Sequence, residues 1–196
     1  MKNPNHPKKG SNIKVEPIRD IAVIQRIKRQ LSDHPRNLCL FTVGINTAFR
    51  ASDLLRIKVG HVRNLQPKQS VELKEKKTGN HRRVTFNDTC IKVINDYLNT
   101  RPTAHDDEYL FVGLRGVITV QYVNRLVKQW CINGKAAKAN YGSHSLRKTW
   151  GYHQRVTFDS DIPQLMEAFG HSSQKQTLAY LGIQAEEIEA LYLNEL

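Results

Sequence analysis

The stretch that decides the fold of this chain reads Phe169-Gly170-His171-Ser172-Ser173-Gln174-Lys175-Gln176-Thr177-Leu178-Ala179-Tyr180-Leu181-Gly182. The spacing of Ser173 and Gln176 matches a capping box, which predicts a short helix that ends at the closing glycine. In one unbroken helix, at ~100° per residue, His171 and Tyr180 would lie on opposite faces. A break just before Ser173 removes that obstacle. We therefore expect the two side chains to meet, although each alone also fits an ordinary role, a core tyrosine and a helix-end histidine.

A second pair of candidate residues lies upstream, at His144 and Arg147. Their spacing of three places both side chains on one helix face. Ser145 is a good N-cap, which would put Arg147 in the first helical turn. There its guanidinium and the free backbone N–H groups could bind an anion together. A solvated helix face is the ordinary alternative for such a pair.

A third group of candidates precedes these, at Arg50, Asp53 and Lys77. Asp53 follows Arg50 by one helical step, so its carboxylate can hold the guanidinium through a charge-assisted bond. The alternative is a surface pair worth only a few tenths of a kcal/mol. Lys77 lies near a predicted turn, and strand parity places it on the same apolar face as Val71 and Leu73. A lysine on a covered face is less easily explained as solvated charge.

The excess of basic over acidic residues indicates what kind of molecule this protein binds. The chain has 196 residues, enough for one domain, with 30 Lys and Arg against 18 Asp and Glu, a net charge of +12. Such an excess predicts attraction to a polyanion, most commonly nucleic acid. An anionic membrane surface would also fit the charge, but no long basic amphipathic helix is present to lie on it. No apolar run of ~18 residues could span a membrane, and the N-terminus has no apolar signal region.

The cysteines and the acidic residues indicate no metal site. Cys39, Cys90 and Cys131 are far apart among apolar neighbours, which predicts small core residues in a reducing cytoplasm. Their spacing is not that of a zinc site. The acidic run Asp106-Asp107-Glu108 lies in a Pro- and His-flanked loop, and we interpret it as a solvated turn. We therefore expect neither a metal ion nor another cofactor.

The pattern along the chain predicts an α+β fold that is mainly helical, with one small antiparallel sheet. Residues 1–16 are polar and basic and are interpreted as a flexible arm, followed by a single domain over 17–196. Alternation on either side of Thr78-Gly79-Asn80 predicts a hairpin. Helical periodicity predicts helices that begin near Ile18, after Pro35, at about Arg50, at a cap on Asp88, at Thr119, near Ser143 or Ser145, at Ile162, at Ser173 and at Ala185.

Taken together, these motifs resemble the catalytic domain of the tyrosine recombinase (phage integrase) family. The order is that of the family: Arg, Lys, His-x-x-Arg, Gly-His, Tyr. Residues 46–54 look like its first arginine box, residues 144–149 like its second, and residues 77–79 like its hairpin lysine motif. Gly170 to Leu181 is the most specific part. The family usually has Asp where this chain has Ser145, and both residues are good N-caps.

The resemblance implies the fold of the DNA breaking-rejoining enzymes and the activity of a site-specific DNA recombinase. Tyr180 would attack the scissile phosphate and leave a 3′-phosphotyrosine and a free 5′-hydroxyl. Arg50 and Arg147 would hold the non-bridging oxygens, and His171 would add a hydrogen bond there.

The remaining roles also come from the resemblance. His144 would accept the phenolic proton, Lys77 would donate one to the 5′-oxygen, and Asp53 would orient Arg50. The expected partner is double-stranded DNA, bound by a homo-tetramer. The terminal helix 185–196 would pack on a neighbouring subunit, or else on its own domain. The reaction would need neither metal nor ATP.

One departure from the family concerns the N-terminus. Members commonly carry a separate core-binding domain, whereas only about 17 residues precede the first predicted helix here. The chain therefore resembles a catalytic-domain-only recombinase, as in the short fimbrial-type DNA invertases, or a fragment of a longer integrase.

Two other functions compete with a recombinase. The first is a non-catalytic DNA-binding regulator that retains the fold, and the second is a basic helical module unrelated to DNA. The complete series of six residues favours the recombinase, because a regulator would not need all of them. Type IB topoisomerases share the chemistry, but the Gly-His-Ser-Ser box at 170–173 fits recombinases better.

Overall fold

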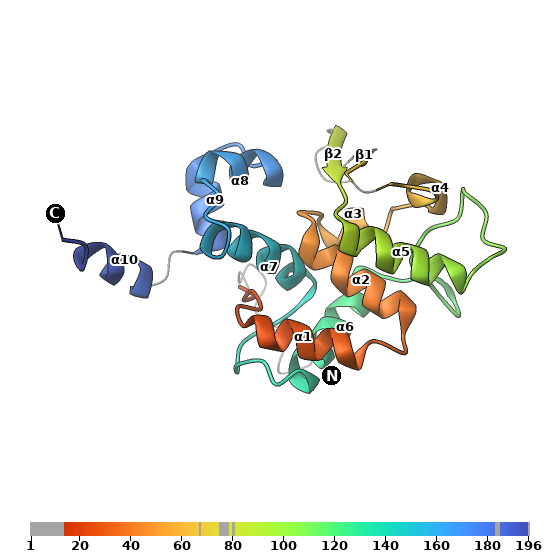
Figure 1. The fold of residues 1–196 in the computed structure, drawn as a ribbon, viewed down its shortest axis with the longest axis horizontal. Coiled ribbons are helices and arrows are strands. Elements are labelled where there is room, and N and C mark those ends of the chain that lie inside the picture. The colour runs from red at the N-terminus through yellow and green to blue at the C-terminus, as the bar shows by residue number, and fades with distance from the viewer. Residues whose placement is uncertain (1–13, 67, 75–78, 80, 183–184, 196) are drawn as a thin grey trace, which may run out of the picture.

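A computed structural model describes residues 14–66, 68–74, 79, 81–182 and 185–195. They form a mainly helical molecule with two small antiparallel hairpins (Figure 1). The elements are α1 Ile21–Gln30, α2 Pro35–Asn46, α3 Ala51–Leu54, α4 Val59–Val62, β1 Ser70–Lys74, β2 His81–Thr85, α5 Asp88–Asn99, β3 Val112–Gly113, β4 Gly116–Val117, α6 Val120–Asn133, α7 Ser143–Val156, α8 Ile162–Phe169, α9 Gln174–Leu181 and α10 Ala185–Tyr192. The predicted fold class, α+β and mainly helical, is confirmed.

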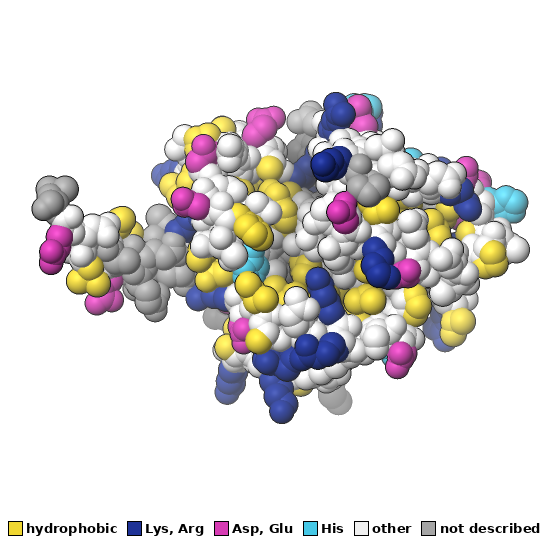
Figure 2. Space-filling view, in the orientation of Figure 1, with side chains coloured by type: hydrophobic (Ala, Val, Ile, Leu, Met, Phe, Trp, Pro, Cys, Tyr) yellow, Lys and Arg dark blue, Asp and Glu magenta, His cyan; other side chains and the backbone are white. Residues whose placement is uncertain are grey.

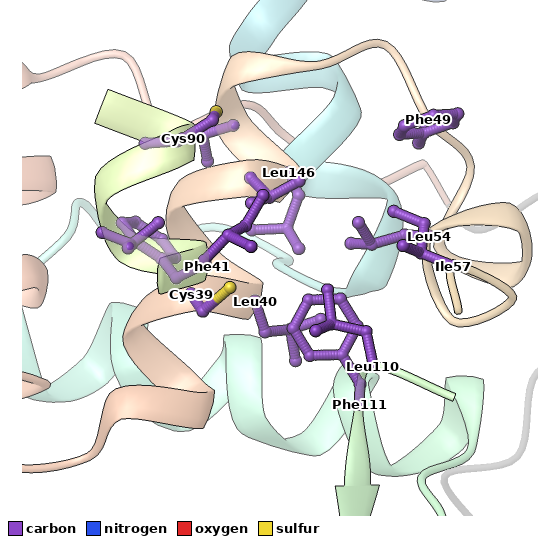
Figure 3. Packing of buried hydrophobic residues seen from close by; sticks show 14 of the residues in the cluster. Cys39, Leu40, Phe41, Phe49, Leu54, Ile57, Cys90, Leu110, Phe111 and Leu146 are labelled. Carbon is purple, nitrogen blue, oxygen red and sulfur yellow. The ribbon is translucent and has the colours of Figure 1, made fainter. Parts of the chain in front are cut away.

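The main core surrounds α2. Every residue of α2 from Cys39 to Ile45 is buried, because α5 and α7 pack on this helix from different sides. Phe41 meets Trp130 of α6 edge to face, with ring centroids 5.7 Å apart. Figure 3 shows Leu40, Phe41 and Leu146 among the buried side chains of this core. Packing against this core holds α7 in place, and α7 contains residues 144–149, the predicted second arginine box.

The predicted hairpin is present as β1 and β2. Val71 pairs with Val84 and Leu73 with Arg82 in an antiparallel register. Val71 and Leu73 are buried while Glu72 and Lys74 are exposed, so the predicted alternation is correct. Lys77, which the same parity argument selected, lies outside the described residues.

A second, smaller core lies where α8 and α9 pack on α7. It consists of Ala48, Leu165, Phe169 and Leu181, with Tyr180 packed at its margin. The helix α8 ends at Gly170, whose φ of 60° is left-handed, and α9 begins at the N-cap Ser173, whose hydroxyl accepts from the Gln176 amide. The expected break between His171 and Tyr180 is therefore present.

Three predicted helix starts are wrong, each for a local reason. The helix expected from Ile18 begins at Ile21, with Asp20 as its N-cap, and the amide of Ile18 donates instead to Thr149 Oγ1 at 2.8 Å. Asn87 rather than Asp88 caps α5, since its side chain accepts from the Cys90 amide. Arg50 is not helical; it stands in extended conformation as the N-cap of α3.

The two ends of the chain differ in their contacts. Within the predicted arm, residues 1–13 lie outside the described part, while the amide of Glu16 donates to the carbonyl of Asn140 at 2.9 Å. At the other end, α10 stands apart from the other helices (Figure 1). The apolar side chains of Ile188, Leu191 and Tyr192 are exposed on it. The predicted boundary between arm and domain stays a prediction.

Candidate active site

Four segments from three distant regions of the sequence meet beside the small core. They are the link between α2 and α3, the first turns of α7, the α8–α9 turn, and the end of α9. These segments carry Arg50, Arg147, His171 and Tyr180, so the structure brings together four of the six residues that the sequence nominated.

Arg147 is the most buried of these residues, with 2% of its surface exposed. Its guanidinium donates to the carbonyl of Ala48 at 2.6 Å and to that of Phe169 at 2.7 Å. Its Cζ also lies 4.8 Å from the centroid of the Phe169 ring. Two main-chain carbonyls from different elements thus set the guanidinium in one orientation, which is the preorganisation that anion binding requires.

Arg147 lies deeper in its helix than the sequence predicted. Ser145 is not the N-cap: α7 begins at Ser143, and the Ser145 hydroxyl accepts from the Gly142 amide at 3.1 Å. Arg147 is therefore one turn further in than expected, beyond the free N–H groups of the helix start. His144 does lie in the first turn, with an exposed side chain.

Arg50 and Asp53 lie together as predicted. Asp53 is buried, and its Oδ2 is 3.9 Å from a terminal nitrogen of Arg50, whose side chain is 17% exposed. This separation is within ion-pair range but too long for a hydrogen bond. The charge of the buried carboxylate therefore lies close enough to orient the guanidinium.

The rings of His171 and Tyr180 lie edge to face, with centroids 5.3 Å apart. His171 also stacks on Phe169 at 5.0 Å, and its Nδ1 lies 3.1 Å from Thr177 Oγ1. Phe169 in turn contacts Tyr180 at 5.2 Å between centroids. Phe169 is thus the common support of both functional rings, a role that the sequence did not indicate.

The phenol of Tyr180 is subject to opposing influences. Burial raises its pKa above the ordinary value of 10.0, whereas the positive charges of Arg147 and Arg50 lower it. The hydroxyl has no partner of ordinary hydrogen-bond geometry among the described residues. A phenol buried beside two guanidinium groups stays neutral until a further favourable charge or base acts on it.

A cavity of about 580 Å³ opens next to this cluster. Arg82 and Arg83 of β2 line one side, and Ala48, Trp150 and Gly170 line the other. Since Ala48 and Gly170 adjoin the groups that hold Arg147, this hollow lies between the hairpin and the arginine. The surface carries further positive charge, and Figure 2 shows Lys and Arg side chains gathered over α1.

Acidic side chains of the predicted solvated turn have arginine partners. Asp106 accepts from Arg63 at 2.6 Å, and Glu108 accepts from Arg101 at 2.7 Å.

Within the described ranges, no group of three or more His, Cys, Asp and Glu side chains is placed to hold a metal ion. In the same ranges, every helix is too short or too polar to cross a membrane.

Comparison with known proteins gives a consistent result. Residues 16–187 match the model of the phage integrase family. The chain is 33% identical over 184 residues to the probable integrase/recombinase YoeC of Bacillus subtilis, covering 91% of this chain and 95% of that protein. It is 30% identical over 168 residues to the tyrosine recombinase XerC of Caldanaerobacter subterraneus, covering 82% of this chain but only 45% of that protein.

Solved structures show the same fold. XerA recombinase superposes with a TM-score of 0.74 at 21% identity, covering 96% of this chain and 65% of that one. XerH recombinase, in a post-cleavage complex with its palindromic difH substrate, also gives 0.74, at 19% identity, covering 93% of this chain and 53% of that one. The chain spans about half to two thirds of these proteins.

Proposed function

This chain belongs to the phage integrase family, and we propose that it is a site-specific DNA recombinase that cuts and rejoins DNA through Tyr180. The observation that carries the proposal is the position of Tyr180, whose ring centroid lies 5.8 Å from Arg147 Cζ and 5.3 Å from that of His171. Burial raises the pKa of this phenol, and the charges of Arg147 and Arg50 oppose that effect. Two cations beside a phenol are suited to a step in which negative charge grows on the phenol and on a phosphate.

In the proposed reaction, Tyr180 Oη attacks the scissile phosphorus and the bond to the 5′-oxygen breaks. The products are a 3′-phosphotyrosine and a free 5′-hydroxyl. Arg147 and Arg50 would hold the non-bridging oxygens, where charge builds in the pentacoordinate transition state. His171, held through its other ring nitrogen by Thr177, would donate a hydrogen bond to the same oxygens.

Proton transfer is assigned to the other two nominated residues. His144 would accept the phenolic proton, and its exposure in the first turn of α7 leaves it accessible to DNA. Lys77 would protonate the leaving 5′-oxygen. The phosphotyrosine bond conserves the energy of the phosphodiester, and the arginines supply positive charge. The proposed reaction therefore needs neither ATP nor a metal ion.

We extend the proposal to the partner and the assembly. XerH, the Tn1549 integrase and lambda integrase have been solved in complex with DNA. We propose that this chain also binds double-stranded DNA in the cytoplasm and acts as a homo-tetramer. The exposed apolar side chains of α10, among them Ile188 and Leu191, are suited to docking on a neighbouring subunit.

The test uses a pool of nicked DNA duplexes with a randomised core, because a nick beside the cut traps the covalent product. Protein and pool are incubated with a chelator, denatured, and the DNA that stays bound to protein is sequenced. We expect a defined site to be enriched with the wild type and nothing with Tyr180→Phe. Tight DNA binding without any adduct would instead favour a regulator that retains only the fold.

Arg147 gives a second test on the enriched site. Arg147→Lys retains a charge but loses the two fixed carbonyl contacts. We expect cleavage to fall by more than about 100-fold, while DNA affinity changes little, because many lysines share the phosphate contacts. An equal loss of binding and cleavage would refute the assigned role. Thermal unfolding shows that the variant is folded at the assay temperature.

A further inference from the structure

Lys148 is a functional candidate outside the six residues nominated from the sequence. It follows Arg147 on α7, and its Nζ lies 5.2 Å from the centroid of the Tyr180 ring. Arg147 Cζ lies 5.8 Å from the same centroid. Both separations are within the range in which a cation is attracted to an aromatic ring. Two consecutive residues of one helix thus bring two cationic side chains to one tyrosine.

The surroundings of Lys148 do not explain it as an ordinary surface lysine. Its side chain is half-buried, and burial lowers the pKa of its ammonium. No carboxylate of the described residues forms an ion pair with it. Withdrawing a cation from water without a paired anion is unfavourable. The Tyr180 ring and the negative charge of Glu16 each offset part of this cost.

The segment before α1 fixes the turn of α7 that carries Lys148. The amide of Ile18 donates to Thr149 Oγ1 at 2.8 Å, and the carbonyl of Ile18 lies 3.0 Å from His153 Nε2. The carboxylate of Glu16 opposes the effect of burial on the Lys148 pKa, whereas Lys14 and Arg19 of the same segment act with it. Lys148 therefore lies between this charged segment and the tyrosine, on a turn that cannot shift freely.

We propose that Lys148 is a positioning residue for the nucleophile, which holds the Tyr180 ring and stabilises its phenolate as cleavage begins. The inference rests on the proposed role of Tyr180. Lys148 transfers no proton: the phenol gives its proton to the base, the new O–P bond forms, and the bond to the 5′-oxygen breaks. The ammonium stays charged throughout, so its effect grows as negative charge develops on the ring.

Two simpler roles make different predictions. If Lys148 only covers the ring with its methylene stem, an uncharged side chain of equal length should serve equally well. If it only contacts a DNA phosphate, its loss should weaken DNA binding without changing how cleavage depends on pH. Among the described residues, the charged and titratable groups that face Tyr180 besides Lys148 are Arg50, Arg147 and His171, and all of them stay unchanged in the test.

The experiment compares Lys148→Met and Lys148→Arg with the wild type on the enriched DNA site. Single-turnover adduct formation is measured at saturating protein between about pH 7 and pH 9. For Lys148→Met we expect the pH dependence of the cleavage rate to shift by about 1 unit toward higher pH. At a fixed pH this shift is about a tenfold loss of rate. Lys148→Arg should restore the profile. Lys175→Met, which removes an exposed charge from the helix that carries Tyr180, should leave it unmoved.

A readout without cleavage separates this inference from the proposed function. Tyrosines labelled with ¹³C at Cζ are titrated by NMR, and Tyr180→Phe assigns the Tyr180 signal. We expect the phenolic pKa of Tyr180 to rise in Lys148→Met and not in Lys148→Arg. An unchanged pKa, or an unchanged rate profile, overturns the inference. If the pKa rises but no DNA is ever cut, Lys148 is correctly placed and the recombinase proposal fails.

Discussion

Replacement of Gly151 by alanine tests how the packing of α7 positions the nucleophile. A Cβ at Gly151 would lie 2.7 Å from Leu181 Cδ2 and closer still to Phe169 Cζ, with Phe169 Cε2 at 3.1 Å. Real side chains do not approach so closely, so the Phe169 ring must move. That ring supports both His171 and Tyr180, and it is fully buried.

The expected magnitude combines two opposing terms. Overpacking of a filled core costs typically about 1–3 kcal/mol. The better helix propensity of alanine returns about 1 kcal/mol. We therefore expect a net loss of up to about 2 kcal/mol in the free energy of unfolding. A ring displaced by about 1 Å can misalign the attacking oxygen enough to slow cleavage on the order of 100-fold.

Urea unfolding and single-turnover cleavage on the enriched site measure the two effects. Gly134→Ala is the matched control, because its Cβ would lie 2.6 Å from Ile27 Cγ1, in the contact between α1 and α6 and away from Tyr180. We expect both variants to lose stability and only Gly151→Ala to lose cleavage. If neither variant loses cleavage activity, or if both lose it to the same extent, the reasoning is refuted.

Three further predictions follow from the same geometry. Asp53→Asn removes the charge that orients Arg50, and we expect single-turnover cleavage to fall by about 10–100-fold with DNA affinity unchanged in a titration. Thr177→Val removes the contact to His171 Nδ1, and the same assay should show a loss of roughly tenfold in rate while the melting temperature changes little. Burial raises the pKa of the Cys90 thiol from 9.0 to about 12, so the unfolded chain ionises first and stability should decline as pH rises from 9.0 towards 12. Urea unfolding of Cys90→Ala at several pH values should show a shallower decline, and an unchanged slope would exclude this thiol as a cause.

Local signals made much of the site predictable. The break between His171 and Tyr180 depends on Gly170, which takes a left-handed conformation, and on the cap at Ser173. Both features depend on residues close together in the sequence, so the local pattern is enough to predict them. The alternation of β1 and β2 is equally local, because each residue faces opposite to its neighbour.

Long-range contacts account for what the sequence did not predict. Ile18 has the apolar spacing of a helix, yet it lies outside α1, and its amide bonds to Thr149, 131 residues away. Arg147 is held by the carbonyl of Ala48, 99 residues away. The role of Phe169 as a common support and the position of Lys148 also depend on how α8 and α9 pack on α7. No pattern within a single helix could indicate these contacts.

The most direct test of the central claim locates the covalent bond on the protein. The trapped adduct on the enriched site is digested with trypsin and a nuclease, and the peptides are fragmented by mass spectrometry. No Lys or Arg follows Lys175, so one peptide from Gln176 to the C-terminus carries both Tyr180 and Tyr192. We expect the 3′-phosphonucleotide on Tyr180. A nucleotide on Tyr192 or on any other residue, or no adduct on DNA that the protein binds, would contradict the account.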